Sequence, residues 1–194
     1  MHILARLHAT MLPDAVLFGQ FPLIAPPHRP VLAQALRTAA RMLLQSEPMR
    51  MVLAHLAGTV ESLFPGSIAS VLVLDGEGLL RNGASPNLPA DYLDAIDRIR
   101  PDARVGTCAA AAATGEVVLT PDFAADDRWA ELRHLPLALG FVGAWSMPIK
   151  DADGRVLGTF GTYFRQRRAP TPEERQVVGL LAPFAAQAIG LRAA

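Results

Sequence analysis

The sequence has 194 residues, of which 51% are hydrophobic, and this suits one domain with extra helices or a domain plus a tail. Eighteen basic side chains balance eighteen acidic ones. Because nucleic-acid binding needs a basic surface that releases counterions, this neutral, unclustered balance argues against a nucleic-acid partner. No apolar stretch reaches the length that crosses a bilayer, so we expect no membrane partner.

A single cysteine, Cys108, permits neither an internal disulfide nor a thiolate cage for zinc, which fits a reducing cytosol. Pro13 and Asp14 interrupt the apolar patch near the N-terminus, so a secretory signal is not expected. These features favour a cytoplasmic protein.

Residues 1–30 contain five prolines and little periodicity, which predicts a linker or N-terminal arm, and residues 31–194 then form the folded domain. Two helices open that domain. Ser46 is expected to cap the second helix, with Pro48 in its first turn, where a missing amide hydrogen costs least. Apolar residues recur at helical spacing in both: Leu32, Leu36, Ala39 and Leu43, then Met49, Leu53, Leu56, Val60 and Leu63.

The next segments favour a strand pair and then two short helices. Residues 68–74 form a near-continuous apolar run, and the turn at 75–78 leads to a strand at 79–84. Helical spacing marks residues 89–99, and a second helix starts at Thr107 and ends at Gly115, a left-handed cap.

The second half begins with a short strand at 117–120. A helix is expected at 129–139, kinked or broken by Pro136, and a hairpin joins strands 141–149 and 155–164. Gly158 and Gly161 within the second strand indicate close approach by a helix or a ligand.

The final helix, residues 172–191, carries an apolar stripe and an internal proline, Pro183, that should bend or interrupt it. The basic cluster at 165–168 fits a solvated loop better than a phosphate-binding patch. Helices at both ends with a sheet between them give an α+β fold rather than a repeated βαβ unit.

An ordered set of segments resembles the GAF-domain family, small sensory modules of bacterial signalling proteins, of the type found beside diguanylate cyclases and histidine kinases. The segments are residues 64–75, 83–89, 106–108, 127–129, 145–149 and 154–160. The resemblance implies a central antiparallel sheet, with N- and C-terminal helices on one face and a ligand pocket on the other. It also implies that the end helices pair two subunits.

This sequence departs from the family pattern in the expected pocket. Ala109 and Ala110 follow the cysteine, where the family usually has glycine and threonine, and Ala144 stands where a cysteine often precedes the tryptophan. The loss of a hydroxyl and a thiol makes the pocket less polar, so the resemblance alone does not assign a polar family ligand.

Cys108 allows two interpretations. With Thr107 as N-cap, Cys108 lies in the first helical turn, where amide hydrogens and the helix dipole favour thiolate and attract anions. It would then be a redox-sensitive thiol, a haem or metal ligand, or part of an anion cradle. The alternative, which we favour, is a small inert residue packed under the sheet.

Other residues near the expected pocket carry similar alternatives. His134 suits an axial haem ligand or a partly exposed structural histidine, and Trp129 and Trp145 suit stacking on a planar ligand or plain core packing. Asp122 suits ligand orientation or helix capping. The candidate ligand-binding set is Thr107, Cys108, Ala109, Asp122, Trp129, Arg133, His134 and Trp145.

These expectations converge on a non-catalytic sensor. A small molecule would bind between the sheet and the segment Thr107–Arg133 and change how the end helices pack in a homodimer, with a separate signalling output protein as partner. The sequence identifies no cofactor. An alternative is a haem, redox or gas sensor that uses Cys108 or His134, and another is a ligand-free dimerisation module. Free methionine sulfoxide reduction, known in the family, looks to need several pocket cysteines, so an enzyme is not expected.

Overall fold

The computed structural model describes residues 14–191 of the chain, with side chains from residue 16 onward. Its centre is a five-stranded sheet in the order β2-β1-β5-β4-β3, in which every neighbouring pair is antiparallel. The α+β fold with a central antiparallel sheet is therefore confirmed. The strands are β1 (Ser67–Leu74), β2 (Leu80–Ala84), β3 (Val118–Thr120), β4 (Gly143–Lys150) and β5 (Val156–Phe164).

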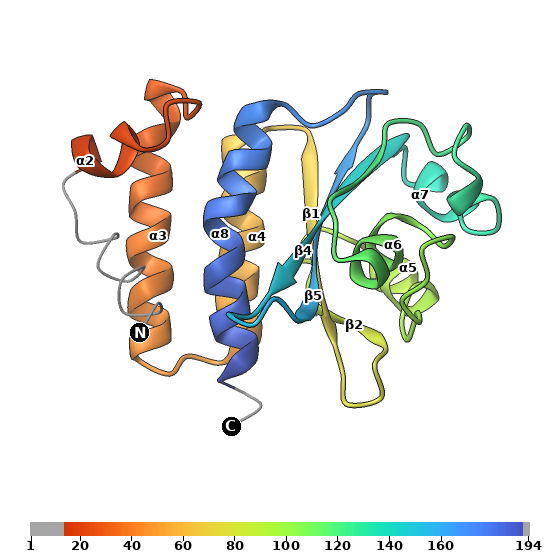
Figure 1. The fold of residues 1–194 in the computed structure, drawn as a ribbon. Coiled ribbons are helices and arrows are strands. Elements are labelled where there is room, and N and C mark those ends of the chain that lie inside the picture. Colours follow the sequence, from red (N-terminus) through yellow and green to blue (C-terminus); the bar gives the residue numbers. More distant parts are fainter. Residues whose placement is uncertain (1–13, 192–194) are drawn as a thin grey trace.

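The two faces of the sheet are covered differently (Figure 1). Three long helices, drawn left of the sheet in Figure 1, cover one face: α3 (Arg29–Leu44), α4 (Met49–Leu63) and α8 (Pro172–Gly190). Short elements cover the other: α5 (Ala90–Ala95), α6 (Thr107–Thr114), η2 (Asp127–Trp129) and α7 (His134–Ala138).

The apolar stripes explain why the long helices form one layer. Leu36 of α3, Leu56 of α4 and Leu181 of α8 are at most 2% exposed and belong to one continuous core. That core also contains Trp145, Phe160 and other side chains from the helix-facing side of the sheet. The helix stripes predicted from the sequence are thus confirmed, except that Leu191, just past the end of α8, is exposed.

The first turn of α8 is fixed by polar groups that the sequence analysis did not single out. Thr171 accepts a hydrogen bond from the amide of Glu174, and the Glu174 carboxylate accepts one from the amide of Thr171. This capping box satisfies two amides at the helix start. Pro183 lies inside α8 without interrupting it.

Residues 14–28 of the N-terminal segment pack against the long helices. Residues 1–13 of the expected linker lie outside the described part of the chain. From there on, α2 (Asp14–Gly19) and η1 (Pro26–His28) lead into α3, and Leu17, Phe18 and Ile24 are buried in the same core as the long helices. The amide of Ala25 also donates a 2.7 Å hydrogen bond to Glu173 of α8.

Two local predictions were wrong. Ser46 does not cap α4, because its backbone has φ of 54° and the helix is preceded directly by Pro48, which offers no side-chain cap. The helix expected at 129–139 is two short elements, η2 and α7, since the chain turns between them and Pro136 lies within α7.

Candidate functional site

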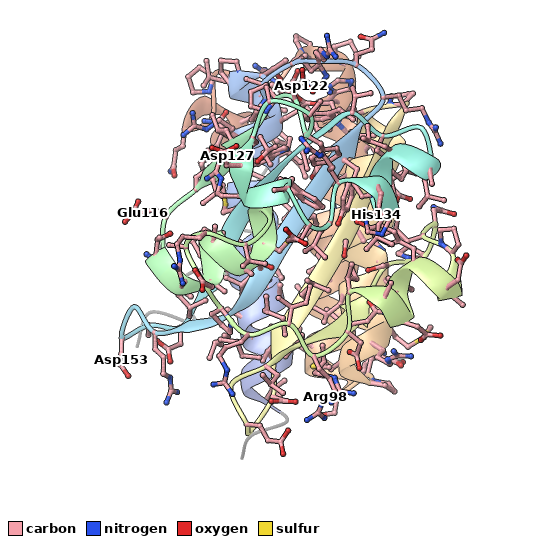
Figure 2. All side chains as sticks on the ribbon, turned by 90° about the vertical axis from the view of Figure 1, so that its right-hand side faces the viewer. Arg98, Glu116, Asp122, Asp127, His134 and Asp153 are labelled. Carbon is pink, nitrogen blue, oxygen red and sulfur yellow. The ribbon has the colours of Figure 1, made fainter. Side chains whose placement is uncertain are left out.

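A partly open cavity of about 30 Å³ lies on the face of the sheet opposite the long helices. Its floor is formed by β1, β2, β4 and β5, one wall by the start of α6, and the outer wall by α5, η2 and the residues that follow them. Figure 2 views this face and shows the outer layer of loops and short helices in front of the sheet. Aliphatic and aromatic side chains dominate the lining, and none of the lining residues is charged.

Two glycines set the ends of the α6 wall. Gly106 precedes the helix with φ of 52°, and its α-carbon faces the Trp129 ring; Gly115 ends the helix with φ of 67°. Both backbones are in the left-handed region that favours glycine. Gly115 confirms the predicted cap, but the N-cap is Gly106, so Thr107 is the first helical residue and its hydroxyl is free for other partners.

Cys108 of α6 points down onto the sheet. A Cβ atom at Gly161 would lie 2.9 Å from the Cys108 sulfur, so the glycine in β5 permits the helix to approach. Burial raises the pKa of the Cys108 thiol, and the opposing effect of the Ser146 and Thr159 hydroxyls is smaller. The group is therefore a neutral thiol, in agreement with the packing interpretation and against a thiolate at the helix start.

A directed chain of hydrogen bonds ties the outer wall to α6. The indole Nε1 of Trp129 donates to Oγ1 of Thr107 at 2.9 Å, and Thr107 donates to Oγ1 of Thr120 in β3 at 3.0 Å. Thr120 then donates to Oδ2 of Asp126 at 2.9 Å. Because an indole nitrogen only donates, the direction of each bond in this chain is fixed.

An ion pair ends this chain at the surface. Arg128 donates to Asp126 at 2.6 Å and to the carbonyl of Leu119 in β3 at 2.9 Å, while its own carbonyl accepts a 2.7 Å hydrogen bond from Gly106. Burial raises the pKa of Asp126, but the hydrogen bonds from Arg128 and Thr120 outweigh it and leave the pKa below its ordinary value. The segment η2 is thereby attached to both β3 and the start of α6.

Two tyrosines meet across the cavity. Tyr92 of α5 and Tyr163 of β5 share a 3.0 Å hydrogen bond between their hydroxyls, and their rings meet edge to face at 6.0 Å. Burial raises the pKa of both phenols well above the ordinary value, so both remain protonated. Neither residue was among the candidates from the sequence, although Tyr163 follows Gly161 by two residues on the same side of the strand.

The structure brings part of the predicted residue set together. Thr107, Cys108, Ala109 and Trp129 line the cavity. Trp145 borders it, but its side chain belongs to the core under the long helices, because successive residues of β4 face opposite sides of the sheet. The indole ring therefore packs in the core, and a ligand-binding role for Trp145 stays a prediction.

Three predicted residues lie outside the cavity lining. Asp122 accepts a hydrogen bond from the amide of Ala124 and pairs with Arg167 at 2.8 Å, and Arg133 donates to the carbonyl of Ala124 at 3.0 Å. His134 is exposed at the start of α7, in the outer layer of Figure 2. A ligand role for these three residues stays a prediction.

The basic cluster at 165–168 is a set of paired side chains. Arg165 donates to the carbonyl of Leu139 at 2.8 Å, and Arg168 pairs with Glu174 at 2.6 Å while lying 3.6 Å from the centre of the Phe164 ring. Together with the Arg167–Asp122 pair, these contacts anchor the loops around the sheet.

Two further features bear on what the site can hold. Within residues 14–191, no group of three or more His, Cys, Asp or Glu side chains is arranged to bind a metal ion. In the same part of the chain, no helix combines the length and the apolar character that crossing a membrane requires.

Comparison with known proteins agrees with this fold. The family model described as GAF domain matches residues 46–190. The chain is 34% identical over 139 residues to the methyl sulfide methyltransferase-associated sensor of Methanosarcina acetivorans, a match that covers 71% of this chain. It spans only 14% of that relative's length.

Solved structures with low sequence identity share the fold. The GAF domain of a phosphoenolpyruvate-protein phosphotransferase from Coxiella burnetii is 17% identical with a TM-score of 0.67, covering 84% of this chain and 95% of that one. Free methionine-R-sulfoxide reductase from Neisseria meningitidis is 19% identical with a TM-score of 0.66, covering 86% and 92%. Since the family model matches most of the sequence and the topology agrees, the chain belongs to the GAF domain family.

Proposed function

We propose that this GAF domain is a non-catalytic sensor that binds a small molecule in the cavity between the sheet and the segment Thr107–Arg133. The observation that carries this proposal is the cavity itself, which has an uncharged lining and an outer wall of short elements. Its volume of about 30 Å³ is far below the roughly 300 Å³ of a small ligand pocket. A ligand therefore has to displace the outer wall, and this displacement is the conformational signal.

The sheet offers a route for that signal to the long helices. Ser146 of β4 lies beneath Cys108 of α6, and its neighbours Trp145 and Met147 face the core under the long helices. A shift of β4 at the cavity would therefore be felt on the opposite face, where α8 packs.

We propose that the long helices pass the signal on within a homodimer. Among the described residues, six of the seven large apolar side chains that remain exposed lie in or beside the helices of this layer and the segment packed on it. They are Val16, Leu23, Val31, Leu44, Met51 and Leu191. Such exposure is typical of surfaces that associate.

The sensing role is supported by the curated relative, whose name describes a sensor associated with a methyl sulfide methyltransferase. This chain spans only 14% of that relative's length. We propose that a separate signalling output protein receives the signal. The single cysteine fits action in the cytoplasm.

A second candidate function is a ligand-free dimerisation module, and the small cavity favours it. Reductase chemistry, the activity named for one structural neighbour, is not proposed, because forming and resolving a disulfide needs two thiols and this chain has one. Haem ligation is not proposed either, because Cys108 is a partly buried neutral thiol that points onto the sheet and His134 is exposed outside the cavity lining.

Two measurements test the proposal. A screen of small metabolites by thermal shift should find at least one compound that raises the melting temperature, since binding to the native state stabilises it. The same compound should shift the backbone amide signals of Gly106, Thr107 and Cys108. Light scattering across a range of concentrations should show a dimer. A chain that ignores every compound but still dimerises would support the ligand-free module instead, and a monomer at high concentration would contradict the helix-mediated signal.

A further inference from the structure

The charge of the cavity lining restricts what can bind there. All lining side chains are neutral, and the nearest ionised groups described above, Asp126 and Arg128, are paired with each other. A carboxylate, phosphate or ammonium group in this cavity would lose its hydration without meeting an opposite charge, and this makes its binding unfavourable. The cavity therefore selects against ions of either sign.

The hydrogen-bonding groups of the lining are also nearly used up. The Thr107 hydroxyl both accepts from Trp129 and donates to Thr120, and the Trp129 N–H has no further hydrogen to give. The Ser146 and Thr159 hydroxyls beneath Cys108 have no hydrogen-bond partner among the described residues, but neither residue lines the cavity. Trp145 and Thr162 do border it and also carry an unpartnered polar group, but their side chains lie on the helix-facing side of the sheet, as Phe160 and Phe164 do. These groups leave little for a ligand to engage.

The tyrosine pair is the exception. Each phenol has one hydrogen, and the bond between Tyr92 and Tyr163 uses one of the two. The other hydroxyl hydrogen has no acceptor among the residues that the structure describes. An acceptor atom on a ligand would complete the pair without displacing any protein hydrogen bond.

We propose, building on the sensor function above, that the cavity takes an uncharged, largely apolar molecule of a few heavy atoms with one hydrogen-bond acceptor, such as a ketone, ether or thioether. The acceptor binds the free hydroxyl hydrogen of the Tyr92–Tyr163 pair, and the apolar groups contact Ile96 and Leu132 in the outer wall. Tyr163 belongs to the sheet and Tyr92 to the outer wall, so the acceptor atom of the bound ligand lies where the sheet meets the outer wall.

Matched probes of one shape test this ligand class. We would titrate 2-butanone, its cationic analogue sec-butylammonium and the anion propionate, and follow the amide signals of Gly106, Thr107, Cys108 and Gly161. We expect 2-butanone to shift these signals with a Kd at least about tenfold below that of either ion, a ratio equal to about 1.4 kcal/mol. Diethyl sulfide should behave like 2-butanone, although its bulk requires the outer wall to open further.

The double variant Tyr92→Phe/Tyr163→Phe tests the acceptor site. Removing both partners of a buried hydrogen bond leaves no unpaired group, so the variant should fold. Its Kd for 2-butanone should rise about tenfold, the loss of one hydrogen bond to the ligand. Ser62→Ala removes a hydroxyl from an exposed site on α4, on the other face of the sheet, and should leave the Kd unchanged.

The outcomes separate this inference from the sensor function. Ions that bind as tightly as 2-butanone at these amides would overturn the ligand class and leave the sensor function standing. An unchanged Kd in the double variant would overturn the role of the tyrosine pair. Should no probe shift these amides, even after Leu132→Ala enlarges the cavity at the outer wall, both this inference and ligand sensing at this site would be wrong.

Discussion

The two faces of the sheet are built in different ways. On one face, helices of 16, 15 and 19 residues enclose a single continuous apolar core. On the other face, helices of five to eight residues cover three smaller, separate apolar clusters. The second face relies instead on side-chain hydrogen bonds such as the chain from Trp129 to Asp126.

The two faces of the sheet are therefore expected to differ in the free energy needed to open them. A continuous core unfolds as a unit, whereas short elements held by a few polar contacts open at lower free energy. The same strands serve both sides, because Ala144 faces the cavity-side cluster and Trp145 faces the helix-side core. The cavity side can therefore open while the helical side keeps the fold.

The largest expected effect is on the helical side. Leu181→Ala should lower the free energy of unfolding by about 3 kcal/mol, because Leu181 is 0% exposed and leaves a cavity in the main core. Leu132→Ala on the outer wall should cost about 1 kcal/mol, since Leu132 is only partly buried and its surroundings can collapse. Urea unfolding of both variants measures the difference. Equal losses would contradict the contrast between the faces.

The next effect concerns the loop that leads into α8. Burial raises the pKa of Glu174, but the hydrogen bonds from Arg168 and Thr171 outweigh it, so the pKa in the folded state is below the ordinary 4.5. A group with a lowered pKa stabilises the fold above its unfolded pKa, and the stabilisation is lost as the pH falls through the folded pKa. Glu174→Gln should lower the free energy of unfolding by about 2 kcal/mol near pH 7. The loss is smaller than for breaking a fully buried ion pair, because Arg168 keeps some contact with water.

The pH profile distinguishes this ion pair from simple packing. The stability difference between wild type and Glu174→Gln should shrink as the pH falls from about 6 to about 3, and chemical unfolding at several pH values measures it. Glu131→Gln, at an exposed position, should show no such convergence. A difference that stays constant with pH would assign the loss to packing.

Patterns that repeat along the chain could be predicted, and they account for most of the fold. The apolar stripes locate α3, α4 and α8, because a helix side is defined by spacing alone. Gly115 could be predicted as a helix end, because glycine favours the left-handed backbone of a C-cap. Gly161 could be predicted as a point of close approach, because a side chain there would take the space of the approaching helix. The N-caps of α4 and α6 could not be predicted from Ser46 and Thr107, because the backbone conformation of the turn decides which residue caps the helix. A serine or threonine near the helix start is not enough.

The site was harder to predict because its contacts join distant residues. Thr107, Thr120 and Trp129 meet only after β3 pairs with β4 and η2 folds back over α6. Ala144 and Trp145 are both apolar, so the sequence does not reveal which of them faces the cavity. Residues 127–138 form two short elements instead of one helix, and His134 therefore lies outside the cavity lining.

Breaking the hydrogen-bond chain should loosen the outer wall more than it destabilises the fold. Thr107→Val keeps the shape of the side chain but leaves the Trp129 N–H and one Thr120 lone pair without their partner, at a cost of about 1–2 kcal/mol. Hydrogen exchange at the Trp129 indole and at the amides of η2 should become faster, while exchange in α8 stays nearly unchanged. Uniform acceleration throughout the chain would mean that the two faces open together.

The smallest expected effect comes from one substitution made at each tryptophan. Trp145 is 1% exposed and its indole N–H has no hydrogen-bond partner, so Trp145→Phe removes an unsatisfied donor while it leaves a small void. These two effects oppose each other, and the net change in unfolding free energy should be within about 1 kcal/mol. Trp129→Phe removes a donor that is bonded to Thr107, so it has no such compensation and should cost more. Urea unfolding of the two variants measures which one loses more unfolding free energy. A larger loss for Trp145→Phe would mean that core packing matters more at these tryptophans than the hydrogen bond from Trp129 to Thr107.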